Sequence, residues 1–233
     1  MKQLKTGWLL TLVLIGILTA TARISSAWND ETHLAIAKVA EYYKWYLAAG
    51  ADMAKIKAGK IESGNHFYNS APDSVVTPAL IETQIDKYNR ENPDGHLYGA
   101  IVHAIRDYAE MRTRGKYGEY HLAFCAHYIG DLSMPLHNRP LSEYSKKYHK
   151  KMEEFVNEDG LDRLVETIKI YPIIIDSEAG LLKEIARIAN ISLQLGYRLQ
   201  TENRLITKAE AYEQLGHSAS LFKAILAYVN QER

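Results

Sequence analysis

Residues 121–158 carry the densest group of candidate metal ligands in the chain, and they read HLAFCAHYIGDLSMPLHNRPLSEYSKKYHKKMEEFVNE. Two pairs in this stretch have the same spacing, His127 with Asp131 and His149 with Glu153. Residues four apart lie on one face of an α-helix, so each pair can place an imidazole beside a carboxylate. Ligands at this offset hold divalent cations in helical zinc sites. The stretch therefore predicts two helices that each carry part of a metal site.

The junction between the two helices adds a third imidazole, His137. Pro135 precedes it, and we expect this proline to end the first helix because proline cannot continue the helical hydrogen bonds. A single histidine–carboxylate pair is more often an exposed polar pair on a helix surface than a metal site. Both pairs and His137 fall between residues 127 and 153, and this density favours metal binding.

The N-terminus has the organisation of a secretory signal peptide over residues 1–27, with two early lysines, an apolar core and small residues before the expected cleavage point. Cleavage after Ala27 would make Trp28 the first residue. The competing interpretation is an uncleaved membrane anchor, since residues 6–22 carry no charge. That run is short for a membrane-spanning helix, which needs about 20 mostly apolar residues. We expect a secreted or periplasmic protein, with N-terminal anchoring as the alternative.

Composition limits the function classes. Removal of residues 1–27 takes away three basic and no acidic residues, which leaves 25 basic against 28 acidic side chains, a formal charge of −3. This balance lacks the basic surplus of a general nucleic-acid binder. Cys125 is the only cysteine, so no intramolecular disulfide can form, and its apolar neighbours predict a buried thiol. Nothing in the composition identifies a protein partner.

The rest of the chain predicts helices joined by short breaks. Apolar residues recur at helical spacing over residues 28–49, and a glycine follows. Residues 59–73 read GKIESGNHFYNSAPD, and we expect this glycine- and asparagine-rich segment to be a loop. Further helices are expected over 161–170, 177–200 and 207–230. No alternation of period two is long enough for a buried strand, so the sequence predicts one all-α domain of seven or eight helices over residues 28–233.

Local signals place several helix ends. Thr77 followed by proline begins one helix, and Asp94 is expected to cap another that stops at Gly115. Thr207 and Glu210 have the spacing of a capping box, in which each side chain bonds the other residue's backbone amide. Three further histidines, His96, His103 and His217, are expected to be structural rather than metal ligands.

Upstream of the central stretch stand three more residues of ligand type, His33, Asp52 and His66. Taken in chain order, the whole set resembles bacterial zinc-dependent phospholipase C, whose superfamily includes zinc-dependent single-strand-specific nucleases. The segments that carry the resemblance are Trp28-Asn-Asp-Glu-Thr-His33, His66-Phe-Tyr, His127-Tyr-Ile-Gly-Asp131 running on to Pro135-Leu-His137, and His149-Lys-Lys-Met-Glu153. The match extends to about residue 156, and the C-terminal third carries no matching motif.

The resemblance implies a helical domain of the zinc-dependent phospholipase C / nuclease type that holds three zinc ions at the bottom of a cleft. One ion would take Asp52, His66, His127 and Asp131; a second would take Trp28 (through its free amine and carbonyl), His33 and the bridging Asp131; the third would take His137, His149 and Glu153. Asp52 is implied as the catalytic carboxylate, both ligand and base. The residues leave Asp73 and Asp30 open as alternatives for the remaining carboxylate ligand.

The resemblance also implies an enzyme that hydrolyses phospholipid headgroup phosphodiester bonds with a metal-activated water. The runner-up is a single-strand nuclease or nucleotidase, since the five-residue interval from Trp28 to His33 is nuclease-like, whereas Glu153 and the interval of 12 from His137 to His149 are phospholipase-like. A second alternative is a zinc-binding exported domain without turnover. The expected partner is a phospholipid or other phosphodiester, with peripheral membrane contact and no specific nucleic-acid partner.

Overall fold

The computed structural model describes residues 30–231, so Trp28 and the expected signal peptide over 1–27 lie outside the described residues. Within that range the chain is helical, with no strand and one isolated bridge between Tyr68 and Gly95. The elements are α2 (Asp30–Val39), η1 (Trp45–Leu47), α3 (Gly50–Ala58), α4 (Lys60–Ser63), η2 (Gly64–His66), α5 (Pro78–Ile85), α6 (Leu97–Thr113), α7 (Glu119–Ser133), η3 (Pro135–Asn138), α8 (Glu143–Glu154), η4 (Asn157–Asp159), α9 (Gly160–Thr167), α10 (Glu178–Thr201) and α11 (Lys208–Gln231), where η marks a 3-10 turn. The all-α prediction is confirmed for the described residues, which contain more helical segments than the seven or eight expected.

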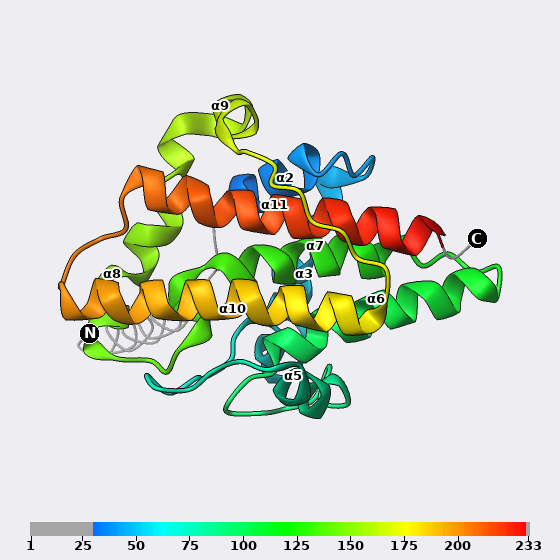
Figure 1. Cartoon of the computed structure of the whole chain (residues 1–233), viewed down its shortest axis with the longest axis horizontal. Coiled ribbons are helices and arrows are strands. Elements are labelled where there is room, and N and C mark those ends of the chain that lie inside the picture. Colours follow the sequence, from blue (N-terminus) through cyan, green and yellow to red (C-terminus); the bar gives the residue numbers. More distant parts are fainter. Residues whose placement is uncertain (1–29, 232–233) are drawn as a thin grey trace, which may run out of the picture.

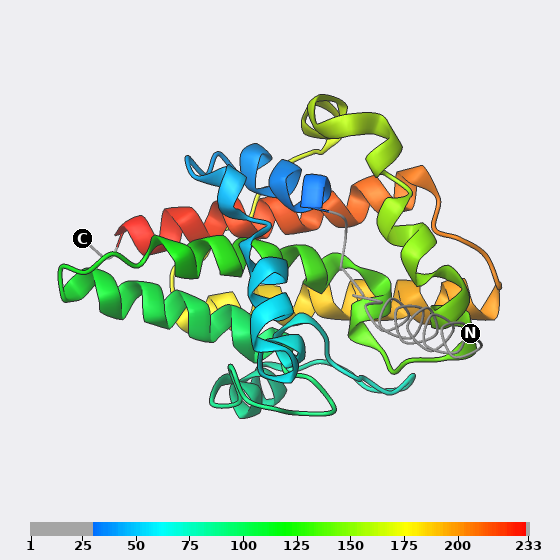
Figure 2. The same ribbon diagram turned by 180° about the vertical axis from the view of Figure 1, so that it is seen from behind.

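The helix α7 forms the centre of the domain. It is covered by α6, α10 and α11, which run beside it, and α3 crosses it on the opposite side (Figures 1 and 2). Every residue of α7 from Cys125 to Ser133 is buried. Most side chains of α7 in this range are apolar, and a mainly apolar helix is expected in a core. The polar residues of α7, among them His127 and Asp131, are therefore buried together with their apolar neighbours. Among residues 30–231, no helix combines the length and the apolar character needed to cross a membrane.

The first helix is shorter than expected, and the prediction of one helix over 28–49 is wrong. The described helix α2 ends at Val39, and Glu41 takes a left-handed backbone conformation with φ of 64°. The amide of Glu41 donates to the carbonyl of Lys38, and that of Tyr42 donates to the carbonyl of Ala37, 3.0 Å each. This pairing is the Schellman arrangement that closes helices, usually with glycine at the left-handed position. Because a glutamate occupies it here, the sequence gives no stop signal.

The expected loop over 59–73 is wrong in its first half, because α4 and η2 occupy residues 60–66. Gly59, with φ of 59°, ends α3 and begins α4, so one glycine joins two helices rather than starting a loop. Asp94 is not the expected helix cap, since α6 begins at Leu97. The caps at Thr77 and at Thr207 with Glu210 are confirmed, as is the burial of Cys125.

Candidate metal centre

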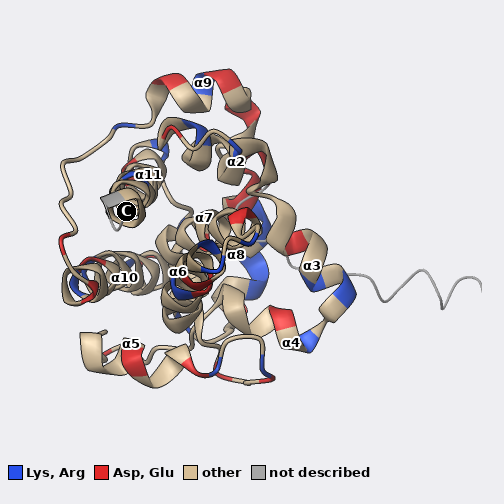
Figure 3. Cartoon of the chain, turned by 90° about the vertical axis from the view of Figure 1, so that its right-hand side faces the viewer, with Lys and Arg blue, Asp and Glu red and all other residues tan. Residues whose placement is uncertain are grey.

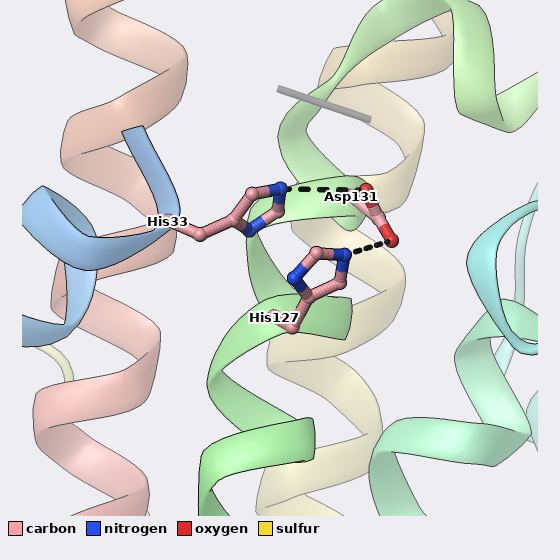
Figure 4. A group of neighbouring side chains, drawn as sticks. All are labelled: His33, His127 and Asp131. Carbon is pink, nitrogen blue, oxygen red and sulfur yellow. Dashed lines mark ion pairs between the residues drawn. The ribbon is translucent and has the colours of Figure 1, made fainter. Parts of the chain in front are cut away.

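Two helices that are far apart in the sequence bring the first group of side chains together. On α7, Nε2 of His127 lies 3.6 Å from Oδ2 of Asp131. From α2, Nε2 of His33 lies 3.9 Å from Oδ1 of the same carboxylate (Figure 4). The rings of His33 and His127 stack with centroids 3.7 Å apart. This approach depends on Gly130, because a Cβ atom there would come within 2.4 Å of Nδ1 of His33.

A second group joins α3 and η2 to the same helix. Oδ1 of Asp52 lies 3.6 Å from Nε2 of His127 and 3.9 Å from Nδ1 of His66. Nδ1 of His66 is in turn 2.9 Å from Oδ2 of Asp131. Tetrahedral zinc with ligand bonds near 2.1 Å separates its ligand atoms by roughly 3.4 Å. Asp52, His66 and His127 therefore have the spacing expected around one ion, and Asp131 adjoins this group through His66 and His127.

The third group lies at the junction of η3 and α8. Nε2 of His137 is 3.0 Å from Nε2 of His149, which is 3.2 Å from Oε1 of Glu153. Two imidazole nitrogens at this distance attract one another only when a proton or a cation lies between them. Nδ1 of His137 also approaches Oδ1 of Asp131 to 3.2 Å. The carboxylate of Asp131 thus lies between the groups, with Oδ2 toward His66 and His127 and Oδ1 toward His33 and His137.

The residues present fit a metal ion. The buried atoms without a hydrogen-bond partner include both carboxylate oxygens of Asp52, Nε2 of His127, Oδ1 of Asp131 and Oε1 of Glu153. Buried polar atoms are nearly always paired, because an unpaired one keeps its full desolvation cost. Each of the three groups also places one atom per residue within 4.8 Å of the others. A cluster of unpaired acceptors with this spacing is the arrangement that bound cations would satisfy.

Backbone contacts fix which nitrogen of two histidines faces the cluster. Nδ1 of His127 is 3.0 Å from the carbonyl of Ala48, and Nδ1 of His137 is 2.7 Å from the carbonyl of His66. When each Nδ1–H donates to its carbonyl, Nε2 is left as a lone-pair donor directed at the cluster. Metal-bound histidines in proteins are commonly held in this way. The folded chain therefore positions ligand-competent imidazoles.

Burial sets the protonation states of the cluster when no cation is bound. Burial, with the nearby Asp131, raises the pKa of Glu153 to about 8, and burial raises that of Asp131 well above its usual value. Burial lowers the pKa of His149 to about 3 and that of His137 to about 4. Without a cation the cluster thus favours neutral imidazoles and protonated carboxylic acids. Neutral imidazole is the ligand form, and a bound cation would favour the ionised carboxylates.

The sequence-based prediction missed a lysine beside the cluster. Nζ of Lys55 lies 4.0 Å from Oδ1 of Asp52, and only 16% of its side chain is exposed. Burial is the main cause that lowers the pKa values of His66 and His137, and the positive charge of Lys55 adds to it; for Glu153 the same charge opposes part of the rise that burial causes. The offset of three from Asp52 on one helix could have indicated it.

A buried glutamate behind His66 was also missed. The hydroxyl of Tyr128 donates to Oε1 of Glu62 over 2.5 Å, and Nδ2 of Asn65 donates to Oε2 over 2.9 Å. Nε2 of His66 lies 3.7 Å from Oε1 of Glu62. Burial raises the pKa of Glu62 to about 7. The offset of four between Glu62 and His66 could be read from the sequence, but only if this segment was taken as helical.

Other predicted positions lie apart from these groups. Asp73 is exposed and belongs to none of them, whereas Asp52 lies with His66 and His127. Asp30, on α2, is near enough for the charge of Asp52 to raise its pKa, after the larger effect of burial. The three histidines expected to be structural have other contacts: His96 with Asn65, His103 with Asp107, and His217 with the ring of Tyr171.

Comparison with known proteins adds no family. No protein-family model, no curated protein and no solved structure matches this chain. The fold and the site by themselves define an all-helical domain with buried histidine and carboxylate groups that could hold metal ions.

Proposed function

We propose that the protein is an exported zinc-dependent phosphodiesterase of the phospholipase C type, which hydrolyses headgroup phosphodiester bonds of phospholipids. The observation that carries the proposal is the convergence of three ligand groups on the single carboxylate of Asp131. Structural zinc needs only one closed set of ligands. Adjacent groups that share a carboxylate suit closely spaced ions acting together on a phosphate ester.

The donor set favours zinc, because imidazole and carboxylate ligands with tetrahedral spacing suit that ion. When bound, zinc would neutralise the phosphate oxygens and lower the pKa of a water molecule toward neutrality. The group of His33, His127 and Asp131 supplies few ligands from the described residues. The free amine and carbonyl of Trp28 would complete it after removal of residues 1–27, so the proposal links activity to export.

Two side chains would act directly on the substrate side of the cluster. Asp52 has two carboxylate oxygens without hydrogen-bond partners, so it can orient a water molecule and hold its proton as well as bind metal. The ammonium group of Lys55, 4.0 Å from that carboxylate, would pair with an anionic phosphate oxygen. The least buried member of the three groups is His149, with 21% of its side chain exposed, and we expect substrate to enter on its side.

The second candidate is a single-strand nuclease or nucleotidase with the same metal centre, and Lys55 is the observation that favours it. An ammonium group at the cluster attracts the additional phosphates of a nucleic acid and repels a cationic headgroup such as choline. The balance of the chain, with 28 basic and 28 acidic residues, gives no general nucleic-acid surface to support this candidate.

The experiment compares two substrates. The exported protein is incubated with p-nitrophenyl phosphorylcholine and with single-stranded DNA, each with and without a chelator. Chelator-sensitive release from the first substrate alone is the expected result. Chelator-sensitive cleavage of DNA alone would replace the proposal with the second candidate. If neither substrate is hydrolysed although zinc is bound, the protein is a zinc-binding domain without turnover.

A further inference from the structure

The tip where α3 meets α4 is an exposed segment of unusual composition. Residues 56–61 read IKAGKI, and all six are exposed. The tip is nevertheless ordered at its turn, because the amide of Gly59 donates to the carbonyl of Lys55 and the carbonyl of Gly59 accepts from the amide of Ser63, 2.9 Å each. A Cβ atom at Gly59 would meet nothing within 4 Å, so the turn points into open space. We call residues 56–61 the α3–α4 tip.

The apolar side chains of the tip are exposed to an unusual degree. Ile56 is 54% exposed and Ile61 46%, and Met53, one turn before Ile56 on the same face, is 65% exposed. Three of the eleven large apolar side chains that are exposed in the described part of the chain, Met53, Ile56 and Ile61, lie on the adjoining helices α3 and α4. Exposed apolar residues gathered in one place mark an interaction surface, whereas scattered ones do not.

The charge of this region is one-sided. Between residues 42 and 72 the chain carries four lysines, of which Lys57 and Lys60 lie in the tip and are exposed. The only carboxylates in that range are Asp52 and Glu62, and both are buried at the metal centre. Figure 3 shows α3 and α4 at the edge of the molecule away from α10 and α11, with basic residues on both. In a chain with no net charge, this edge is a basic and apolar surface.

The tip is close to the metal centre in the fold. Ile56 follows Asp52 by one helical turn, which is about 6 Å along the axis. Glu62, which follows the tip directly, contacts His66. The two isoleucines therefore lie on the same helices as Asp52 and Glu62, close to one side of the ligand cluster.

We propose that the α3–α4 tip inserts Ile56 and Ile61 into the interface of an anionic lipid bilayer while Lys57 and Lys60 bind its headgroups. Apolar side chains next to lysines are the combination that holds peripheral proteins at a membrane surface, with apolar burial and electrostatic attraction acting together. The positive charge of Lys57 and Lys60 argues against a second copy of the chain as the partner, because two tips of the same charge would repel each other. The proposal rests on the proposed function for its substrate, which the bilayer would supply.

The experiment measures sedimentation of the exported protein with vesicles of phosphatidylcholine alone and with vesicles rich in phosphatidylglycerol. One variant carries Ile56→Ser with Ile61→Ser, and a second carries Lys57→Ser with Lys60→Ser. Matched controls are Ile174→Ser with Val75→Ser, which are 89% and 68% exposed elsewhere, and Lys169→Ser with Lys183→Ser, both exposed. All these positions are exposed, so the fold should tolerate the changes.

We expect binding to vesicles rich in phosphatidylglycerol to fall about tenfold or more in the isoleucine variant, and about thirtyfold in the lysine variant. Neither control should change it, and the lysine variant should behave like the unaltered protein on phosphatidylcholine alone. Hydrolysis of soluble p-nitrophenyl phosphorylcholine should be equal in all variants, which separates docking from turnover.

Equal binding of the tip variants and their controls would overturn the proposal. The proposal would also be overturned if the tip variants lost only their binding to single-stranded DNA, because the tip would then bind nucleic acid. A change in the mass of the tip variants in solution would overturn it as well, because the tip would then contact a second copy of the chain. If vesicle binding depends on the tip but the soluble substrate is not cleaved, the proposed hydrolase function is wrong and the proposed membrane binding by the tip is retained.

Discussion

Two buried polar clusters lie side by side at the end of α7, and the protein's own hydrogen bonds satisfy only one of them. In the first, Nδ2 of Asn138 donates to the carbonyls of Leu132 and Met134 at 2.9 and 3.0 Å. The same nitrogen lies 3.1 Å from Oγ of Ser192, and the hydroxyl of Tyr98 donates to Oδ1 over 2.9 Å. This cluster ties η3 to α6, α7 and α10.

The second cluster surrounds Asp131, which is as fully buried as Asn138, at 0% exposure for both. Its Oδ1 nevertheless has no hydrogen-bond partner, and neither have the carboxylate oxygens of Asp52. Asp131 and Asn138 are equally buried, but only Asn138 has its polar atoms fully hydrogen-bonded. Burial of a polar side chain therefore does not by itself indicate a metal site. What distinguishes the candidate metal centre is a set of buried polar atoms that the fold brings together without hydrogen-bond partners, whereas the polar atoms around Asn138 are paired.

The largest effect is expected from Asp131→Asn, which removes the charge shared by the groups. We expect bound zinc to fall and phosphodiester hydrolysis to drop to the level of chelated protein. In unaltered protein, zinc at about 1,000 times its dissociation constant should raise the free energy of unfolding by about 4 kcal/mol, and the variant should lose most of that gain. Metal analysis and urea unfolding measure both. Asp107→Asn, at a partly exposed carboxylate, is the control and should keep its zinc. An Asp131 variant with full zinc content would contradict the proposed site.

Asn138→Ala tests the satisfied cluster. Because it leaves the Tyr98 hydroxyl and two buried carbonyls without their partner, we expect a loss of about 2–4 kcal/mol in the free energy of unfolding. The loss should be the same with and without zinc. In chelated protein, by contrast, Asp131→Asn should be neutral or stabilising, since it removes a buried carboxyl group whose partner is absent. Urea unfolding of both variants in the presence of chelator measures these changes. If the two variants lose the same free energy of unfolding, the two clusters do not differ in the way that their hydrogen bonds indicate.

The pH dependence of the metal-free protein should show the unpaired cluster directly. His149 has a pKa of about 3 in the fold against 6.5 unfolded, so the unfolded chain binds more protons and stability rises with pH across that window. Glu153 has a pKa of about 8 in the fold against 4.5 unfolded, so the folded chain binds more protons and stability falls as pH rises from 4.5 to 8. The two effects cancel between pH 4.5 and 6.5, so we expect a broad maximum of stability over that range and a fall from 6.5 to 8.

Zinc should abolish the fall above that maximum, because it favours the ionised carboxylates. Thermal unfolding between mildly acidic and mildly alkaline pH, with zinc or chelator, measures this. If chelated protein is as stable at pH 8 as at pH 6, the carboxylates are not the buried acids that the structure shows.

The smallest effect is expected from Glu62→Gln, behind His66. The amide can still accept the Tyr128 hydroxyl, but it removes the negative charge 3.7 Å from Nε2 of His66. Loss of such a supporting carboxylate lowers metal affinity about 10- to 100-fold, so we expect weaker zinc binding with turnover restored at high zinc. Zinc titration against a competing chelator measures the affinity. Glu178→Gln, in an exposed pair with Arg106, is the matched control; equal affinities in the two variants would remove Glu62 from the site.

The sequence predicted the part of the centre that is local along the chain. His127 with Asp131 and His149 with Glu153 lie on single helices, so helical periodicity alone places each pair together. The long amphipathic helices α10 and α11 were predictable for the same reason, and the capping box of α11 was predictable from the spacing of Thr207 and Glu210. The contacts of Asp131 with the other segments are tertiary, and only the resemblance to a known family connected them.

The segment around α3 and α4 could not be predicted from periodicity, because its glycines are typical of a loop. In the structure Gly59 uses its left-handed conformation to join two short helices. Two candidate site residues that were missed, Lys55 and Glu62, lie on these helices. The loop expected over 59–73 explains why Glu62 was missed, whereas Lys55 precedes that segment and lies three residues after Asp52 on one helix.

Gly130 links the architecture of the core to the first described helix. With only a hydrogen atom at this position, the imidazole of His33 can rest on the backbone of α7, where a methyl group would collide with it. α2 begins at Asp30, and its His33 reaches the carboxylate of Asp131 only because α2 can approach α7 this closely. A single missing carbon atom in the centre of the molecule thus sets how near the first described helix lies to the shared carboxylate.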